Sequence, residues 1–330
     1  MITKKIFNSF KIENLSIFRT ELMGICILWI MLFHLNISPP PSNIYLRFVW
    51  SIFFSYGGGF GVDSFFILSG FGLMTSELKK TNIGNWKNWY KRRFLRIIPA
   101  YLIVSLSFYS FISESFSDIL YNLSFLNFLM EGDRQFWYIF AICFCYIIFP
   151  LISYLYKKIS FRVVTAFLVL FCLLLCYLIG HCNPIYYQKI EIFLTRIPCF
   201  FIGCYLAILY SNKKVSEYLL IVFISLTLGV LLFKGYISYQ DSSRLGFDFI
   251  SLFVLLIFSS LLSLFNLRKT LLFNYCGRKS LELYLVHVSI GGLCLIYFDS
   301  LVISLFFYFV ISFIISEIVS YVVHLLTTRL

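Results

Sequence analysis

The stretch Ile17–Ile37 is IFRTELMGICILWIMLFHLNI. Its length suits a membrane-crossing helix, because ~20 apolar residues rising ~1.5 Å each span the ~30 Å hydrocarbon layer. Arg19 and Glu21 interrupt its start and His34 its end, so roughly 22 Å of helix separates Arg19 from His34. Ionisable side chains in a span are costly and therefore mark candidate functional sites. The alternative is that Arg19 and Glu21 are interfacial anchors and His34 is a hydrogen-bonded residue at the helix end.

The composition around this stretch is that of a membrane protein. Of 330 residues, 60% are hydrophobic and only 13% are charged, and the mean hydropathy is +0.89. Soluble domains carry about 25% charged residues. The net charge of +12 does not indicate nucleic-acid binding, because no polar segment is long enough to form a basic domain. The ten cysteines lie mostly in apolar runs without CxxC spacing, so we expect no metal site.

Apolar runs between polar flanks predict an all-α, polytopic integral membrane protein. The second run contains YGGGFG at Tyr56–Gly61. Glycines there are expected to break it into a re-entrant or interfacial piece and a span that starts at about Phe60. The ten predicted spans lie near 17–37, 48–76, 94–113, 136–156, 163–180, 192–210, 217–233, 247–265, 281–297 and 300–325.

The distribution of Lys and Arg predicts the orientation. With a cytoplasmic N-terminus and ten spans, all but six of the 27 Lys and Arg fall on the inner side. This bias agrees with the positive-inside rule, so both termini are predicted to be cytoplasmic. We expect residues 1–330 to form a single transmembrane domain with no appended soluble domain. The six outer cations are Arg47, Arg134, Lys189, Arg196, Lys234 and Arg244.

Two polar residues are predicted near the outer ends of neighbouring spans, His34 and Asp63. A carboxylate can fix the tautomer of an imidazole and make it a better general base, which suggests a catalytic pair acting on a hydroxyl. The alternative is that Asp63 caps the helix that follows Gly61 and meets its dipole. His287, in LELYLVHV, is either a second proton-handling group or a hydrogen-bonded contact between helices.

A basic cluster lies at the predicted inner face. Arg92, Arg93 and Arg96 fall in WYKRRFLRIIP, and on a helix Arg92 or Arg93 shares a face with Arg96. Arginine forks suit phosphate groups, although anchoring to anionic lipid is the ordinary role of such clusters. Gly57–Gly72 is glycine-rich without a phosphate-loop pattern. It suits close helix packing or, alternatively, a backbone surface open to a slim ligand.

A third group of candidates lies at the predicted outer face. Glu131, Trp137 and Arg196 combine a carboxylate, an aromatic ring and a cation, which together suit a sugar. The alternative is an aromatic belt with charges at the helix ends.

Four stretches resemble the membrane acyltransferase family three, whose members are integral-membrane O-acyltransferases that modify glycans. They are ELMGICILWIMLFH, GVDSFFILSGF, YKRRFLRIIPAY and LELYLVH, in family order across almost the entire chain. The resemblance implies ten spans, a cytoplasmic acyl-CoA donor, an essential histidine at His34 and donor handling by Arg93 and Arg96. Asp63 matches the family's GVD aspartate. One departure is Met23, where relatives often carry arginine; Arg19 lies one helical turn earlier.

These observations lead to one expected function and two rivals. We expect acetyl transfer from acetyl-CoA to a hydroxyl of a surface or lipid-linked saccharide, in a bacterial cytoplasmic membrane. His34 would act as the base, Asp63 would orient it, and the donor would reach from Arg93 and Arg96 up a channel between spans. Expected partners are acyl-CoA, the glycan and membrane lipid, with a possible homo-oligomer. The first rival is a secondary transporter or glycan exporter, for which paired inverted halves are expected and not found in the sequence. The second is a non-catalytic membrane assembly protein, which would not need the inner arginine cluster and the outer histidine together.

Overall fold

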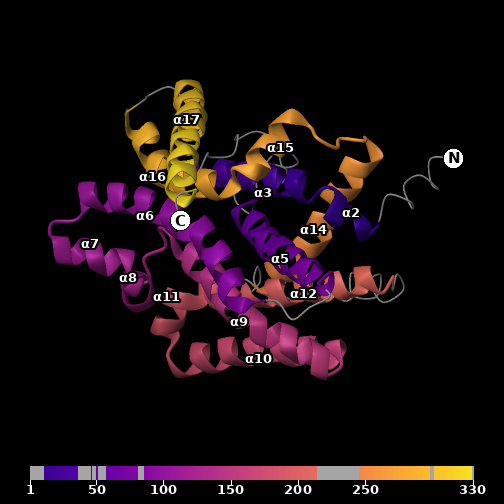
Figure 1. The fold of residues 1–330 in the computed structure, drawn as a ribbon. Coiled ribbons are helices and arrows are strands. Elements are labelled where there is room, and N and C mark those ends of the chain that lie inside the picture. Colours follow the sequence, from indigo (N-terminus) through magenta and orange to yellow (C-terminus); the bar gives the residue numbers. More distant parts are fainter. Residues whose placement is uncertain are drawn as a thin grey trace.

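The structure is a computed structural model, and it describes residues 11–35, 46, 50, 57–80, 85–213, 245–297 and 301–328. Over these residues the chain is helical with no strand, which confirms the all-α prediction. Figure 1 shows the arrangement of the helices. They are α2 (Glu13–Ile17), α3 (Arg19–His34), α5 (Gly57–Leu78), α6 (Trp86–Ile112), α7 (Phe116–Leu123), α8 (Leu126–Glu131), α9 (Trp137–Lys158), α10 (Phe161–Cys182), α11 (Pro184–Leu194), α12 (Ile197–Ser211), α14 (Leu245–Leu264), α15 (Leu271–Arg278), α16 (Ser280–Tyr297) and α17 (Leu301–Thr327).

Six described helical segments are long and apolar enough to cross a membrane. Shorter apolar helices lie at Phe249–Leu264 and Ser280–Ile290, within two further predicted spans. The predicted span 217–233 lies outside the described residues, so ten spans stay a prediction. The six are Gly58–Leu78, Trp86–Ile112, Trp137–Lys158, Phe161–Cys182, Pro184–Ser211 and Ile303–Thr327.

The second predicted span is one helix from its glycines onward. α5 begins at Gly57 and continues to Leu78, so the described glycines form its first turns. The sequence predicts that the span starts at about Phe60, and α5 starts close to that residue. Residues 51–56 lie outside the described part of the chain, so the predicted break before this helix stays a prediction.

α5 is the central helix of the molecule. It packs most extensively against α12 and α3 and also contacts α14 (Figure 1). Over an apolar stretch of 18 residues in each helix, 83% of the residues are buried in α5, against 22% in α10. α10 therefore lies at the edge, with most of its apolar surface turned outward, as expected of a helix that faces lipid.

Glycines allow the closest helix contacts. Gly70 of α5 lies against the backbone carbonyl of Phe200, and Gly203 of α12 lies against that of Ile67. An added Cβ at either glycine would overlap backbone, so small residues permit this approach. The packing role predicted for Gly70 is confirmed.

Charged residues gather where α3 and α16 begin and where α5 and α9 end, together with Glu317 of α17. Glu77 pairs with Lys80 at 2.6 Å and with Lys157 at 3.0 Å, and Glu317 pairs with Lys279 at 2.9 Å. These lysines belong to the predicted inner set. The described helices therefore bring that set to one end of the molecule, and the cytoplasmic location of this end stays a prediction.

Candidate functional site

His34 is the last residue of α3 and its side chain is exposed. Its Nδ1 lies 2.9 Å from the carbonyl oxygen of Ile30, one helical turn earlier. A carbonyl only accepts, so this contact assigns the ring proton to Nδ1 in the neutral state. Nε2 then carries the lone pair. The local helix thus fixes the tautomer that a base needs, without any carboxylate.

His287 is the partner of His34 across the helices. It lies in α16 and is 0% exposed, and its Nε2 is 3.4 Å from Nδ1 of His34. Its own Nδ1 is 2.9 Å from the carbonyl of Leu283, so its proton also lies on Nδ1. The Nε2 lone pair of His287 therefore faces the Nδ1–H of His34. This is the helix-to-helix contact that the sequence offered as one role for His287.

Asp63 is not placed as the orienting group of His34. Gly58 lies against Phe33 and Gly72 against Arg19, so α5 runs antiparallel to α3. This register puts Asp63 about six residues deeper than His34, or roughly 9 Å along the axis. Asp63 instead lies 3.2 Å from Nε of Arg196 and accepts a 2.7 Å hydrogen bond from Ser251. The predicted His34–Asp63 contact is therefore replaced by the His34–His287 contact.

Arg196 completes a buried polar cluster with Asp63. It lies where α11 ends and α12 begins, and it is 4% exposed. Its Nη1 donates to the carbonyl of Ile192 at 3.0 Å, and its guanidinium lies 5.0 Å from the centre of the Trp137 ring. The cluster joins α5, α9, α12 and α14 through a carboxylate, a cation, a ring and the hydroxyl of Ser251.

The three predicted sugar-binding residues are divided between two places. Trp137 and Arg196 meet in the buried cluster, and Trp137 is itself 6% exposed. The carboxylate of Glu131, at the end of α8, is 66% exposed and lies 3.7 Å from Lys189. Glu131 is thus the member of the set that lies open to an external molecule.

The predicted phosphate-binding arginines lie in the first turns of α6. Arg92 is exposed, and the Arg93 guanidinium lies 5.8 Å from the Trp89 ring centre. Arg96 donates to the backbone carbonyl of Arg278 at 3.1 Å and lies 3.6 Å from the buried Glu282. Arg96 therefore joins α6 to α15 and α16, a contact between residues 182 positions apart.

Arg19 lies at the opposite end of α3 from His34. Its Nε donates to the carbonyl of Leu68 at 3.2 Å, and its guanidinium packs against Gly72. It lines a cavity of about 290 Å³ together with Lys79 and the hydroxyl residues Ser16, Thr75 and Ser76. Arg19 therefore belongs to the basic end of α3, one helical turn from Met23, and its supply of the charge that relatives carry at position 23 stays a prediction.

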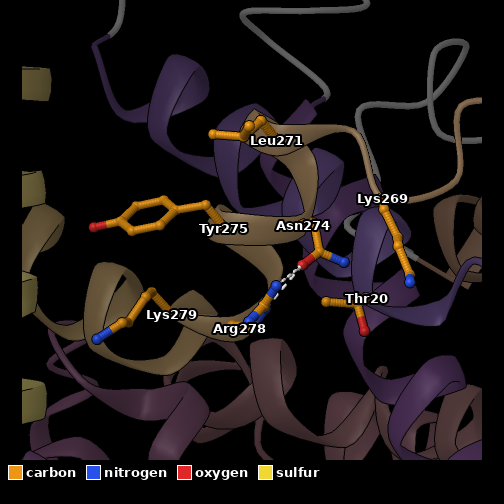
Figure 2. Close-up of a pocket in the computed structure, with 7 residues that line it drawn as sticks. All are labelled: Thr20, Lys269, Leu271, Asn274, Tyr275, Arg278 and Lys279. Carbon is orange, nitrogen blue, oxygen red and sulfur yellow. Dashed lines mark hydrogen bonds between the residues drawn. The ribbon is translucent and has the colours of Figure 1, made fainter.

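A larger basic cavity lies beside α15 (Figure 2). Its volume is about 650 Å³, and it is lined by Thr20, Lys269, Leu271, Asn274, Tyr275, Arg278 and Lys279. The buried Glu21 accepts hydrogen bonds from the Lys269 backbone at 2.7 Å and from Asn274 at 3.2 Å. Burial, together with the hydrogen bond to Glu317, raises the pKa of Tyr275 above its usual range. Tyr275 is therefore a neutral hydroxyl at physiological pH.

Sequence reasoning missed the distant partners. Ser251, Glu282 and Lys269 each lie 180 or more positions from the residue they contact. A serine in an apolar run or a lysine in a loop carries no signal of such a contact. Across the described residues, no three His, Cys, Asp or Glu side chains gather to hold a metal ion.

Fold and site together define a multi-pass, all-helical membrane protein in which one exposed imidazole rests on a buried one. The family described as "Acyltransferase domain", membrane acyltransferase family 3, matches residues 22–325, and the chain belongs to it. It is a membrane acyltransferase. Neither the curated proteins nor the solved structures that were compared with the chain include a match.

Proposed function

We propose that this acyltransferase moves an acetyl group from cytoplasmic acetyl-CoA to a hydroxyl of a surface or lipid-linked polysaccharide. The observation that carries the proposal is the state of His34 in a chain of this family. Its Nδ1 is occupied by a backbone carbonyl and by His287, and its side chain is exposed. The Nε2 lone pair is thereby left for a substrate proton.

In the proposed step, Nε2 of His34 takes the proton of the acceptor hydroxyl while the hydroxyl oxygen forms a bond to the thioester carbonyl carbon. The carbon–sulfur bond then breaks. The departing CoA sulfur takes the proton back from His34, so the products are an ester and a thiol. The Nε2 of His287 accepts from Nδ1–H throughout and holds the ring in this orientation.

The donor is proposed to enter from the basic end. Arg93 and Arg96, at the start of α6, are suited to the phosphates of CoA, and Arg92 lies on the same helix. The thin pantetheine arm would then extend toward His34 over roughly the 22 Å that separates Arg19 from His34 on α3. In this arrangement Asp63 takes no part in the proton transfer. Its ion pair with Arg196 holds α5 beside α12.

The acceptor is proposed to bind on the opposite side, near Glu131, with Trp137 and Arg196 shaping the site from beneath. An extracytoplasmic glycan in a bacterial cytoplasmic membrane fits this arrangement. A homo-oligomer is compatible with it and is not needed for the chemistry.

The test is transfer of label from acetyl-CoA to extracted glycan in membranes that contain the protein. His34→Ala is expected to abolish ester formation. His324→Ala is the matched control, because His324 is an exposed histidine on α17 and contacts no proposed group. Equal labelling by His34→Ala and the unmodified protein, at equal protein levels, would remove His34 as the base.

For the donor site, Arg93→Ala/Arg96→Ala is expected to raise the acetyl-CoA concentration needed for half-maximal rate. Lys158→Ala is the control, since Lys158 is a cation at the end of α9. An unchanged requirement in the double variant would reassign the two arginines to lipid anchoring.

A further inference from the structure

The basic cavity beside α15 adjoins an apolar groove between α3 and α14. The groove has a volume of about 440 Å³, and its walls include Leu28, Leu32, Phe258, Leu261 and Phe273. Phe273 faces the groove, and the next residue, Asn274, faces the cavity. One short helix therefore separates a basic compartment from an apolar one.

The charge of the cavity suits a phosphate. Lys279 forms an ion pair with Glu317. The guanidinium of Arg278 donates two hydrogen bonds to the side-chain oxygen of Asn274, which is neutral. Across the described ranges, the side chains of Lys269 and Arg278 contact no carboxylate. Two cations, with the hydroxyl of Thr20 beside Lys269 (Figure 2), provide donors for an anionic oxygen.

The length and surface of the groove suit an acyl chain. Thr20 lines the cavity and Leu32 the far end of the groove, so the two compartments extend over about 18 Å of α3. One leaflet of hydrocarbon is about 15 Å thick. Leu261 is 42% exposed, Phe265 is 65% exposed and Leu271, at the cavity, is 89% exposed. Leu271 lines the cavity and Leu261 and Phe265 line the groove, so both compartments present exposed apolar side chains.

We propose that the cavity and the groove together bind one anionic phospholipid. Its phosphate lies between Lys269 and Arg278, and one acyl chain runs along α3 and α14. Basic pockets between helices at the cytoplasmic side are suited to anionic headgroups. A soluble phosphate ligand would use the cavity alone, because the groove offers it no polar contact. His34 does not line this site, although the groove ends at Leu32 of the same helix, and the proposal does not depend on the proposed acyl transfer.

The test is native mass spectrometry of the protein released from vesicles of equimolar phosphatidylglycerol and phosphatidylcholine. The unmodified protein is expected to retain phosphatidylglycerol preferentially. Lys269→Gln/Arg278→Gln is expected to lower that retention about tenfold, since each cation near a headgroup contributes measurably to binding. Lys158→Gln, a cation at the end of α9, is the matched control and should retain the lipid.

A second variant separates lipid from a soluble ligand. Leu261→Trp fills the groove and is expected to lower retention without any change of charge. Leu261→Phe serves in its place if the larger ring reduces the yield of folded protein, measured by thermal melting. Undiminished phosphatidylglycerol in the double variant would overturn the proposal. So would displacement of the lipid by free CoA together with full retention in both Leu261 variants, because the cavity would then belong to the nucleotide.

Discussion

Among the polar pairs of the described helices, Asp63–Arg196 and His34–His287 differ in whether one member stays exposed. Asp63 and Arg196 are 0% and 4% exposed, and their charges meet each other, Ser251 and Trp137. His34 and His287 meet without a carboxylate, and His34 is exposed. A buried charge whose opposite charge is buried beside it indicates a group that holds helices together. A fixed tautomer on an exposed ring marks a group that can exchange a proton.

The largest expected effect is on the exposed member of the histidine pair. His34→Gln keeps a polar side chain but removes the basic nitrogen, so the acyl-transfer rate should fall between about a hundredfold and ten-thousandfold. The melting temperature in detergent should stay close to that of the unmodified protein, because the side chain is exposed. A rate within tenfold of normal would contradict the assignment.

The second effect tests the buried pair by stability. Asp63→Ala leaves the Arg196 cation uncompensated in the interior, which typically costs about 3–5 kcal/mol. Thermal melting and the yield of folded protein measure the loss. Replacing both groups, in Asp63→Ala/Arg196→Met, should recover much of the stability, because no charge then remains buried. If the double variant is less stable than either single variant, the pair does more than compensate charge.

A smaller effect is expected at His287. His287→Leu removes one of the two acceptors at Nδ1 of His34 and leaves the Ile30 carbonyl, so kcat should fall about tenfold while KM for acetyl-CoA stays unchanged. His287→Gln restores an acceptor oxygen and should recover part of the rate. A general packing defect would not be rescued by glutamine, so equal losses in the two variants would show that His287 acts through packing alone.

The smallest effect is expected at an ion pair whose cation, Lys157, is exposed although its partner Glu77 is buried. Lys157 lies 3.0 Å from Glu77 with its side chain 55% exposed, and Lys80 also contacts that carboxylate. Lys157→Ala should therefore change the free energy of unfolding by at most about 1 kcal/mol. Chemical denaturation in detergent measures it. A loss as large as that of Asp63→Ala would show that exposure does not separate the two kinds of pair.

Some of this is readable in the sequence, because the signal is local. Long apolar runs predict the helices, and His34 is a candidate site residue because it is an ionisable side chain within one of those runs. Gly70 is a small residue in an apolar helix, and its packing role follows from that. The partners are not readable, because they depend on how helices meet: Asp63 and Arg196 are 133 positions apart. The short helix α15 is also missed, since eight residues of mixed polarity between two spans resemble a loop.

The contact between α3 and α15 also has a consequence for how the protein is made. Gly24 lies against the Phe273 carbonyl and Gly277 against the Thr20 carbonyl, and Glu21 awaits donors from Lys269 and Asn274. This part of α3 therefore meets a segment that leaves the ribosome about 250 residues later. At ~5–20 residues per second, that interval lasts on the order of 10–50 seconds. Throughout it, the Glu21 carboxylate and the face of α3 that contains Gly24 lack the partners that Lys269, Asn274 and Phe273 provide.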